Sequence, residues 1–316
     1  MKETEGVFSG RQRESQIQES QPQVWQEAQM PQEYQYASPV RKFFAGIVVS
    51  ILILAAFIGI QIVVSVMAIV GKAVPFIEAS NGDMNDIMTQ LQPIIQDPVF
   101  MTNLTVIATV VSAVAAVFFY WLIFGRKKTM EDKRFFREKV LKGRVFFMIW
   151  IAAFGLYYLA ILISGVIEAA SPQTMQDYTE MMDLALGGNL LAAMLAAVLL
   201  APISEECILR GLILKNLQKY FSAPVVIIIQ AVLFGVFHMN WVQGLYVVPV
   251  GAALGFVALK CRSVLPSIFM HMVYNFMSVF VALLPAFCQT WIFAVIAVVA
   301  SGAVVWFMGK QSEGFE

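Results

Sequence analysis

Two adjacent carboxylates and an arginine follow a long apolar run in the stretch Ala201-Pro-Ile-Ser-Glu-Glu-Cys-Ile-Leu-Arg210. Ionisable side chains inside a membrane segment cost about 2.5 to 3.5 kcal/mol each to insert, so they usually face a protein interior or a wet cavity and mark function. On a helix, Glu206 and Arg210 lie four residues apart and can pair, whereas Glu205 points about 100° away from Glu206. Glu205 is therefore free for general acid–base chemistry, because an unpaired carboxylate in a low-dielectric site accepts a proton more readily than a paired one.

The chain contains two histidines, and both lie in apolar segments. His238 follows Phe234 by one helical turn, a spacing at which the phenyl ring can pack on the imidazole and fix its rotamer. His271 precedes Asn275 by the same spacing, so the two side chains point the same way. A lone histidine in a membrane helix is often only a hydrogen-bonded contact between helices. Two histidines with helical companions, and a carboxylate pair on a third segment, instead predict one catalytic constellation.

The same residue types also fit a metal centre. Glu205, His238 and His271 with a water would form a tetrahedral catalytic zinc site. The sequence contains no His-Glu-x-x-His motif, and its three cysteines are scattered without a Cys-x-x-Cys pair. We favour a metal-free mechanism with a glutamate base and keep zinc as the alternative.

The composition places this site in a membrane. Of the 316 residues, 59% are hydrophobic and 13% are charged, with a mean hydropathy of +0.74. Soluble domains carry about 25% charged residues, so we predict an all-α polytopic membrane protein. A net charge of zero and the lack of a dense basic stripe argue against a nucleic-acid partner. The oligomeric state is left open.

Eight apolar runs follow a polar N-terminal tail. Residues 1–39 are rich in Gln, Glu and Ser, which predicts a disordered cytoplasmic tail ahead of a membrane domain at 40–316. With about 20 apolar residues per crossing, we predict about eight transmembrane helices. Their expected ranges are 43–71, 99–124, 145–167, 187–209, 223–239, 243–259, 264–284 and 290–308.

The distribution of charge predicts the orientation. When the tail is placed in the cytoplasm, every Lys and Arg except Lys72 lies on the cytoplasmic side. The positive-inside rule therefore predicts that both termini are cytoplasmic. We expect a multi-pass protein of a bacterial plasma membrane. Straight helices would place His238 roughly 20 Å further out than Glu205, so a common site needs a tilted, bent or partly submerged fifth helix, or a deep cavity.

Three motifs stand in order, each on its own predicted helix. They are Glu205-Glu206-x-x-x-Arg210, Phe234-x-x-x-His238 and His271-x-x-x-Asn275. Over about residues 185–285 this pattern resembles the CPBP family of CAAX-processing and bacteriocin-processing intramembrane proteases, also called ABI proteins. The resemblance implies that Glu205 activates a water with the help of His238. It further implies that His271 and Asn275 donate to the oxyanion, and that Glu206 and Arg210 form a supporting pair.

The resemblance implies an intramembrane endopeptidase whose cavity opens toward the cytoplasm and whose substrate is a membrane-associated peptide or protein. Eukaryotic relatives act after a prenylated cysteine, whereas bacterial relatives are linked to peptide maturation and bacteriocin self-immunity, so the substrate stays open. Two other functions remain as alternatives. One is a catalytically inactive relative that acts as a membrane scaffold or immunity protein, and the other is a proton-coupled transporter with the Glu/His cluster as its relay.

Overall fold

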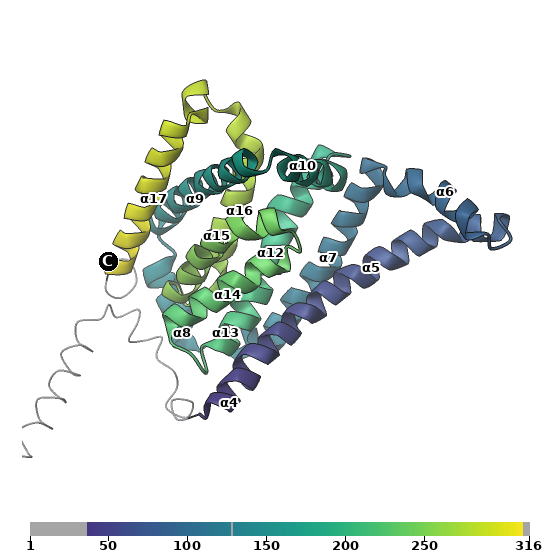
Figure 1. Cartoon of the computed structure of the whole chain (residues 1–316). Coiled ribbons are helices and arrows are strands. Elements are labelled where there is room, and N and C mark those ends of the chain that lie inside the picture. The colour runs from purple at the N-terminus through teal and green to yellow at the C-terminus, as the bar shows by residue number, and fades with distance from the viewer. Residues whose placement is uncertain (1–36, 128, 312–316) are drawn as a thin grey trace, which may run out of the picture.

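The computed structural model of the chain describes residues 37–127 and 129–311. Every regular element in these two ranges is a helix (Figure 1), which confirms the predicted all-α class. The predicted tail at residues 1–39 lies outside the described residues except for its last three positions.

Seven helical stretches within the described residues have the length and apolar composition to cross a membrane. They are Pro39–Ala79, Pro98–Lys127, Gly143–Ala170, Leu190–Leu217, Trp241–Lys260, Val264–Leu283 and Trp291–Lys310. The remaining predicted span, 223–239, forms helix α14 (Ala223–Phe237) of only 15 residues. At 1.5 Å per residue α14 is about 22 Å long, shorter than the hydrocarbon layer of about 30 Å. The chain is therefore a multi-pass membrane protein in which one predicted span is only a short helix.

The fourth span does not end at 209 as predicted but continues to Leu217. It consists of α11 (Leu190–Met194), the π-helical segment η4 (Leu195–Leu200), α12 (Ala201–Glu206), a second π-helical segment η5 (Cys207–Ile213) and α13 (Leu214–Leu217). The wide turns of η4 lie next to Pro202, which has no N–H to donate to the preceding turn. Arg210 does not end the helix, because its charge is paired inside the protein.

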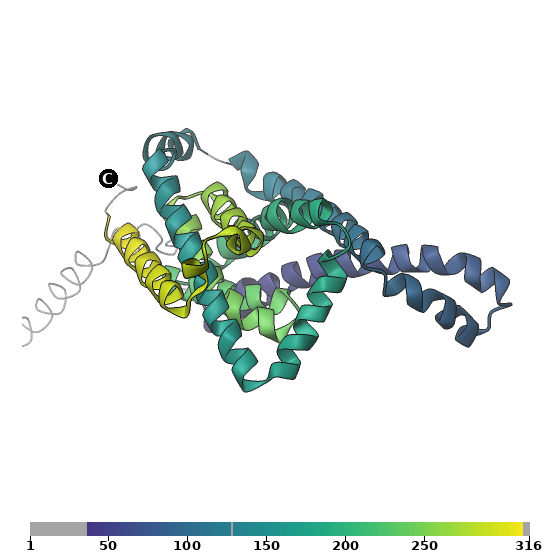
Figure 2. The same cartoon turned by 90° about the horizontal axis from the view of Figure 1, so that it is seen from above.

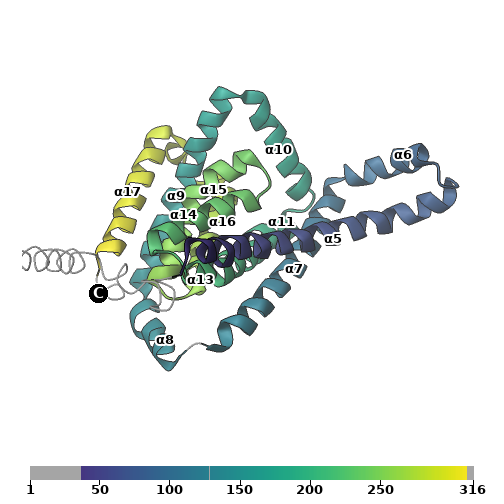
Figure 3. The same cartoon turned by 60° about the horizontal axis from the view of Figure 1, so that its bottom comes forward.

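The N-terminal half begins with a long helical arm. The first stretch comprises α4 (Pro39–Arg41), the π-helical η1 (Lys42–Val48) and α5 (Val49–Ala79). Helix α6 (Met84–Ile95) turns back along the end of α5 and buries Ile87 and Leu91, and α7 (Pro98–Ile123) then enters the bundle. Figure 3 shows the outer part of α5 and α6 extending away from the other helices.

Short elements join the next spans. The 3₁₀ turn η2 (Gly125–Lys127), α8 (Met130–Phe135) and the π-helical η3 (Phe136–Val140) connect α7 to α9 (Gly143–Ala170). Helix α10 (Pro172–Leu186) follows α9 after Ser171 alone, and Figure 2 shows the sharp corner between these two helices. The corner directs α10 back across the bundle, where it contacts α7 and α9.

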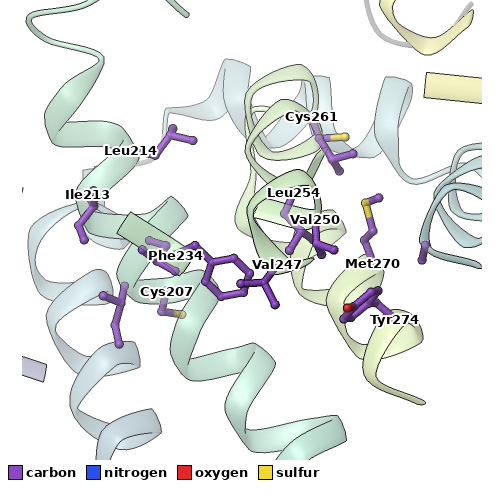
Figure 4. Packing of buried hydrophobic residues seen from close by; sticks show 14 of the residues in the cluster. Cys207, Ile213, Leu214, Phe234, Val247, Val250, Leu254, Cys261, Met270 and Tyr274 are labelled. Carbon is purple, nitrogen blue, oxygen red and sulfur yellow. The ribbon is translucent and has the colours of Figure 1, made fainter. Parts of the chain in front are cut away.

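The C-terminal half contains the helices that meet the fourth span. They are α15 (Trp241–Lys260), α16 (Val264–Phe280) and α17 (Trp291–Lys310), with 3₁₀ turns η6 (Val281–Leu283) and η7 (Ala286–Gln289). Helix α14 packs closely on α15, because a Cβ atom on Gly235 would lie 2.8 Å from the carbonyl oxygen of Gly244. Figure 4 shows side chains of the buried cluster that α14, α15, α16 and η5 share, among them Phe234, Val247 and Met270.

Candidate active site

The Glu206–Arg210 ion pair lies at the buried bottom of the site. Arg210 Nη1 donates to Glu206 Oε1 at 2.7 Å, and neither side chain is exposed. The expected pair on one helical face is therefore present. Arg210 Nη2 also donates to the carbonyl oxygen of Gly251 on α15 at 2.9 Å, which ties the fourth span to the α14–α15 hairpin.

Glu206 has a second partner on α16. His271 Nδ1 lies 3.0 Å from Glu206 Oε1, and the imidazole is almost fully buried. A carboxylate only accepts, so Nδ1 carries the hydrogen of this bond. His271 is thus fixed in orientation by a carboxylate whose own position is set by Arg210.

The surroundings of Glu205 differ from those of Glu206. Its Oε2 has no hydrogen-bond partner within the described part of the chain and lies 3.8 Å from His271 Nε2. The Glu205 side chain is 13% exposed, whereas that of Glu206 is fully enclosed. The two neighbouring carboxylates therefore differ as their angular separation on the helix predicts, one paired and one turned toward open space.

His238 caps the C-terminal end of α14 and is half-buried. Its Nδ1 lies 2.8 Å from the carbonyl oxygen of Phe234, so Nδ1 donates and Nε2 is left as an acceptor in the neutral ring. The Phe234 ring packs on this imidazole with a centroid distance of 4.8 Å. It also lies 5.6 Å from the His271 ring and 4.8 Å from the Arg210 guanidinium carbon, so it contacts all three groups.

Asn275 lies one turn beyond His271 on α16. Its Nδ2 donates to the carbonyl oxygen of Ala197 in η4 at 2.7 Å. Because the amide nitrogen carries two hydrogens, one remains for another acceptor. The side chain is thereby held in place without losing its capacity to donate.

One cavity collects these side chains. Glu205, His238, His271 and Asn275 all line a space of about 890 Å³, together with Phe234. A volume in this range is typical of sites that enclose a small ligand. The residues that the three motifs bring together thus share one pocket, whereas Glu206 and Arg210 lie behind its wall.

The expected difference of roughly 20 Å between Glu205 and His238 along the helix axes was an overestimate. Because the fourth span continues to Leu217, Glu205 lies 12 residues, about 18 Å, from its end. His238 lies 15 residues, about 22 Å, from the start of α14 at Ala223. The two heights agree to within about one helical turn, so no sharp bend is needed to bring them together.

The cavity has a polar wall that the motifs did not indicate. Gln61 of α5 and Thr105 and Thr109 of α7 line it. The hydroxyl groups of Tyr178 on α10 and Tyr246 on α15 lie 2.6 Å apart at another part of its wall. The sequence signal was present, since hydroxyl residues recur on one face of α7 at 102, 105, 109 and 112 within an otherwise apolar span.

The zinc alternative rests on Glu205, His238 and His271, which line the same cavity. Within residues 37–127 and 129–311, no group of three or more His, Cys, Asp or Glu side chains is positioned to hold a metal ion. We therefore derive the chemistry below from the side chains alone.

Comparison with known families identifies the segment that carries the site. Residues 187–277 match a family model described as type II CAAX prenyl endopeptidase Rce1-like. This segment contains all three motifs, and the match confirms the resemblance that they carry. No curated protein and no solved structure gave a match.

Proposed function

Since residues 187–277 carry the Rce1-like segment of type II CAAX prenyl endopeptidases, a family of intramembrane proteases, we propose that the chain hydrolyses a peptide bond with a water activated by Glu205. The observation that carries this proposal is the unpaired Oε2 of Glu205, which lines the cavity together with both histidines. A general base must be within reach of the reacting water and must not be neutralised by a partner. Glu205 meets both requirements, and Glu206 meets neither.

His238 holds the water on the side opposite its own backbone contact. With Nδ1 committed to the Phe234 carbonyl, Nε2 accepts a hydrogen bond from the water. Packing of Phe234 on the ring restricts its rotation. The water is then oriented by two acceptors, Glu205 and His238, with its oxygen lone pair directed at the substrate carbonyl carbon.

His271 and Asn275 stabilise the oxyanion of the tetrahedral intermediate. Asn275 donates its second amide hydrogen. The Nδ1 hydrogen of His271 is directed at Glu206, so His271 donates to the oxyanion from Nε2 when this nitrogen also carries a hydrogen. Each preorganised oxyanion donor contributes about 3 kcal/mol to transition-state stabilisation.

The protons balance over the two steps. Glu205 takes one proton as the water oxygen bonds to the carbonyl carbon, and it gives that proton to the leaving amine as the carbon–nitrogen bond breaks. The second proton of the water remains on the product acid and passes to the released amine, so the products are a carboxylate and an ammonium group. We propose that the substrate is a membrane-associated peptide or protein that enters from the cytoplasmic side of the bilayer, the side on which the basic segments lie.

The test is a peptidase assay of the purified full-length protein against a peptide library. Glu205→Gln removes the base and keeps the shape, so we expect cleavage to fall by about 10² to 10⁴-fold, the usual contribution of a general base. The matched control is Glu168→Gln, because Glu168 is a carboxylate of the same cavity on α9. His238→Ala should also abolish most cleavage. Full activity of Glu205→Gln, or equal loss in Glu168→Gln, contradicts the proposal.

A further inference from the structure

A second pocket lies behind the buried ion pair. It has a volume of about 490 Å³ and is lined by Asp132, Arg210, Lys215, Lys260 and Arg262. These residues come from α8, η5, α13, the end of α15 and the turn that follows α15. The pocket therefore lies at the end of the bundle where α15 ends and α16 begins, and it does not share its lining with the cavity that holds Glu205.

Cations dominate this pocket. Its wall carries four Lys or Arg side chains and one carboxylate, Asp132. Aromatic rings support two of the cations: Lys215 Nζ lies 5.2 Å from the Tyr120 ring centroid, and the Arg262 guanidinium lies 4.5 Å from that of Phe135. Such contacts stabilise a cation in a partly apolar wall, and Lys260 Nζ donates to the carbonyl oxygen of Gln311.

Arg210 reaches the pocket from the protein interior. Its guanidinium is almost fully buried, with Nη1 and Nη2 bound to Glu206 and Gly251. Its Nε is enclosed and has no hydrogen-bond partner within the described residues. A buried donor without a partner costs about 1 to 3 kcal/mol, so the guanidinium that lines this pocket keeps one donor that no described residue satisfies.

Helix α16 adds donors to the same place. Ser263 caps this helix by accepting from the backbone N–H of Leu265 at 3.3 Å, so its hydroxyl hydrogen stays available. Ser263 and Val264 both line the pocket. The positive end of the helix dipole and the first N–H groups of a helix favour a bound anion such as a phosphate.

We propose that this pocket binds a phosphate-bearing anion, and that the head group of an anionic phospholipid is its source. Basic pockets between membrane helices at the level of the lipid head groups bind such lipids. The site is independent of the peptidase activity proposed above, because none of its lining residues touches the reacting atoms. Arg210 of this pocket is bonded to Glu206, and Glu206 is bonded in turn to His271 in the wall of the cavity that holds Glu205.

The experiment measures lipid binding to the full-length protein in detergent by native mass spectrometry. Phosphatidylglycerol and phosphatidylcholine are compared on the unmodified protein and on Lys215→Gln/Arg262→Gln. We expect preferential binding of phosphatidylglycerol, and a loss of about 30-fold in the double variant, since each interfacial Lys or Arg contributes about fivefold. Arg262→Gln alone is the smaller change and should weaken phosphatidylglycerol binding by about fivefold.

The matched control is Lys127→Gln/Lys133→Gln, which removes two exposed cations near the same end of the bundle but outside the pocket. It should bind phosphatidylglycerol as the unmodified protein does. Inorganic phosphate is then added to the lipid-bound protein: displacement identifies free phosphate as sufficient, and retention identifies the lipid head group, and both support the site. Equal binding of the two lipids, or equal loss in the control, would overturn the proposal.

Discussion

Glu206 accepts from two groups at once, and this double role organises the site at the scale of single residues. Arg210 and His271 both approach Oε1, at 2.7 and 3.0 Å. The charge of Arg210 keeps Glu206 anionic, and the anionic Glu206 in turn fixes the imidazole that faces Glu205. These two adjacent glutamates thus differ in role because Glu206 is bonded to Arg210 and His271, whereas Glu205 faces a cavity.

Removal of one member of the buried pair should cost more than removal of both. Arg210→Met or Glu206→Gln leaves a partner without its counter-charge or its acceptor, at a cost of about 3 to 5 kcal/mol for an orphaned buried charge. The double variant Glu206→Gln/Arg210→Met should recover much of that stability while staying inactive. Thermal unfolding in detergent measures the difference.

The control for this cycle is the surface pair Arg134–Glu138, which has the same spacing and a 3.1 Å contact but side chains that are 74% and 46% exposed. Arg134→Met should change the free energy of unfolding by less than about 1 kcal/mol. Additive losses in the buried double variant would show that Glu206 and Arg210 are not coupled.

The metal question also belongs to this scale. Because the described Glu and His side chains are not arranged as a three-ligand site, we expect the purified enzyme to keep most of its activity in the presence of a strong chelator such as phenanthroline. Peptide cleavage before and after dialysis against the chelator is the measurement. Complete loss that only zinc restores would replace the glutamate mechanism with a metal-assisted one.

At the scale of helices, close backbone contact positions the proposed catalytic groups. Helices α14 and α15 touch through glycines, and Gly251 leaves room for the Phe234 ring while its carbonyl oxygen accepts from both Arg210 and Gln230. Small residues allow membrane helices to approach closely. The wide turns of η4 and η5 flank the two carboxylates, as such irregular turns often do at functional sites.

A single methyl group at this contact should therefore reduce catalysis. In Gly235→Ala the added Cβ would lie 2.8 Å from the Gly244 carbonyl oxygen, so α14 must shift and His238 must move with it. A displacement near 1 Å can cost about 100-fold in rate. Peptidase assays and circular dichroism together should report lost activity with retained helix content.

Gly302→Ala is the companion variant, because no atom lies within 4 Å of a Cβ at that position of α17. It should be at least as stable as the unmodified protein, since alanine favours a helix over glycine by about 1 kcal/mol. If Gly235→Ala were as active as Gly302→Ala, the glycine contact would not position His238.

At the scale of the whole molecule, basic residues concentrate at one end of the spans. The connecting segment from η2 to η3 carries exposed cations such as Lys133, and the opposite connections carry exposed acids such as Asp86. This pattern predicts that the end with Lys133 faces the cytoplasm. It also predicts the side from which a substrate reaches the cavity.

Cysteine labelling tests the orientation directly. The native residues Cys207, Cys261 and Cys288 are buried and should react slowly. In intact cells a membrane-impermeant maleimide should label Asp86→Cys and leave Lys133→Cys unlabelled, and both should react once the membrane is opened. Labelling of Lys133→Cys in intact cells would reverse the predicted topology.

The sequence predicted most of this architecture because membrane burial is visible in composition. The apolar runs located seven spans, and helical spacing placed Glu206 beside Arg210 and Phe234 beside His238. Prediction failed where tertiary contacts override local chemistry. Arg210 resembled the end of a span because its hydrogen bond to the Gly251 carbonyl oxygen on α15 cannot be read from neighbouring residues. This one boundary caused the misplaced depth of Glu205.

The outer face of α14 has a consequence for the lipid around it. Val225, Ile228, Val232 and Val236 are exposed at helical spacing, so this short helix borders the acyl chains directly. A helix that is too short for the bilayer forces local thinning, at a modest cost for each ångström of hydrophobic mismatch. We therefore expect the membrane to be thinner beside the helix that ends at His238, so that the polar backbone of a substrate crosses less hydrocarbon there. Longer acyl chains raise the cost of that deformation, so turnover should depend on the thickness of the membrane.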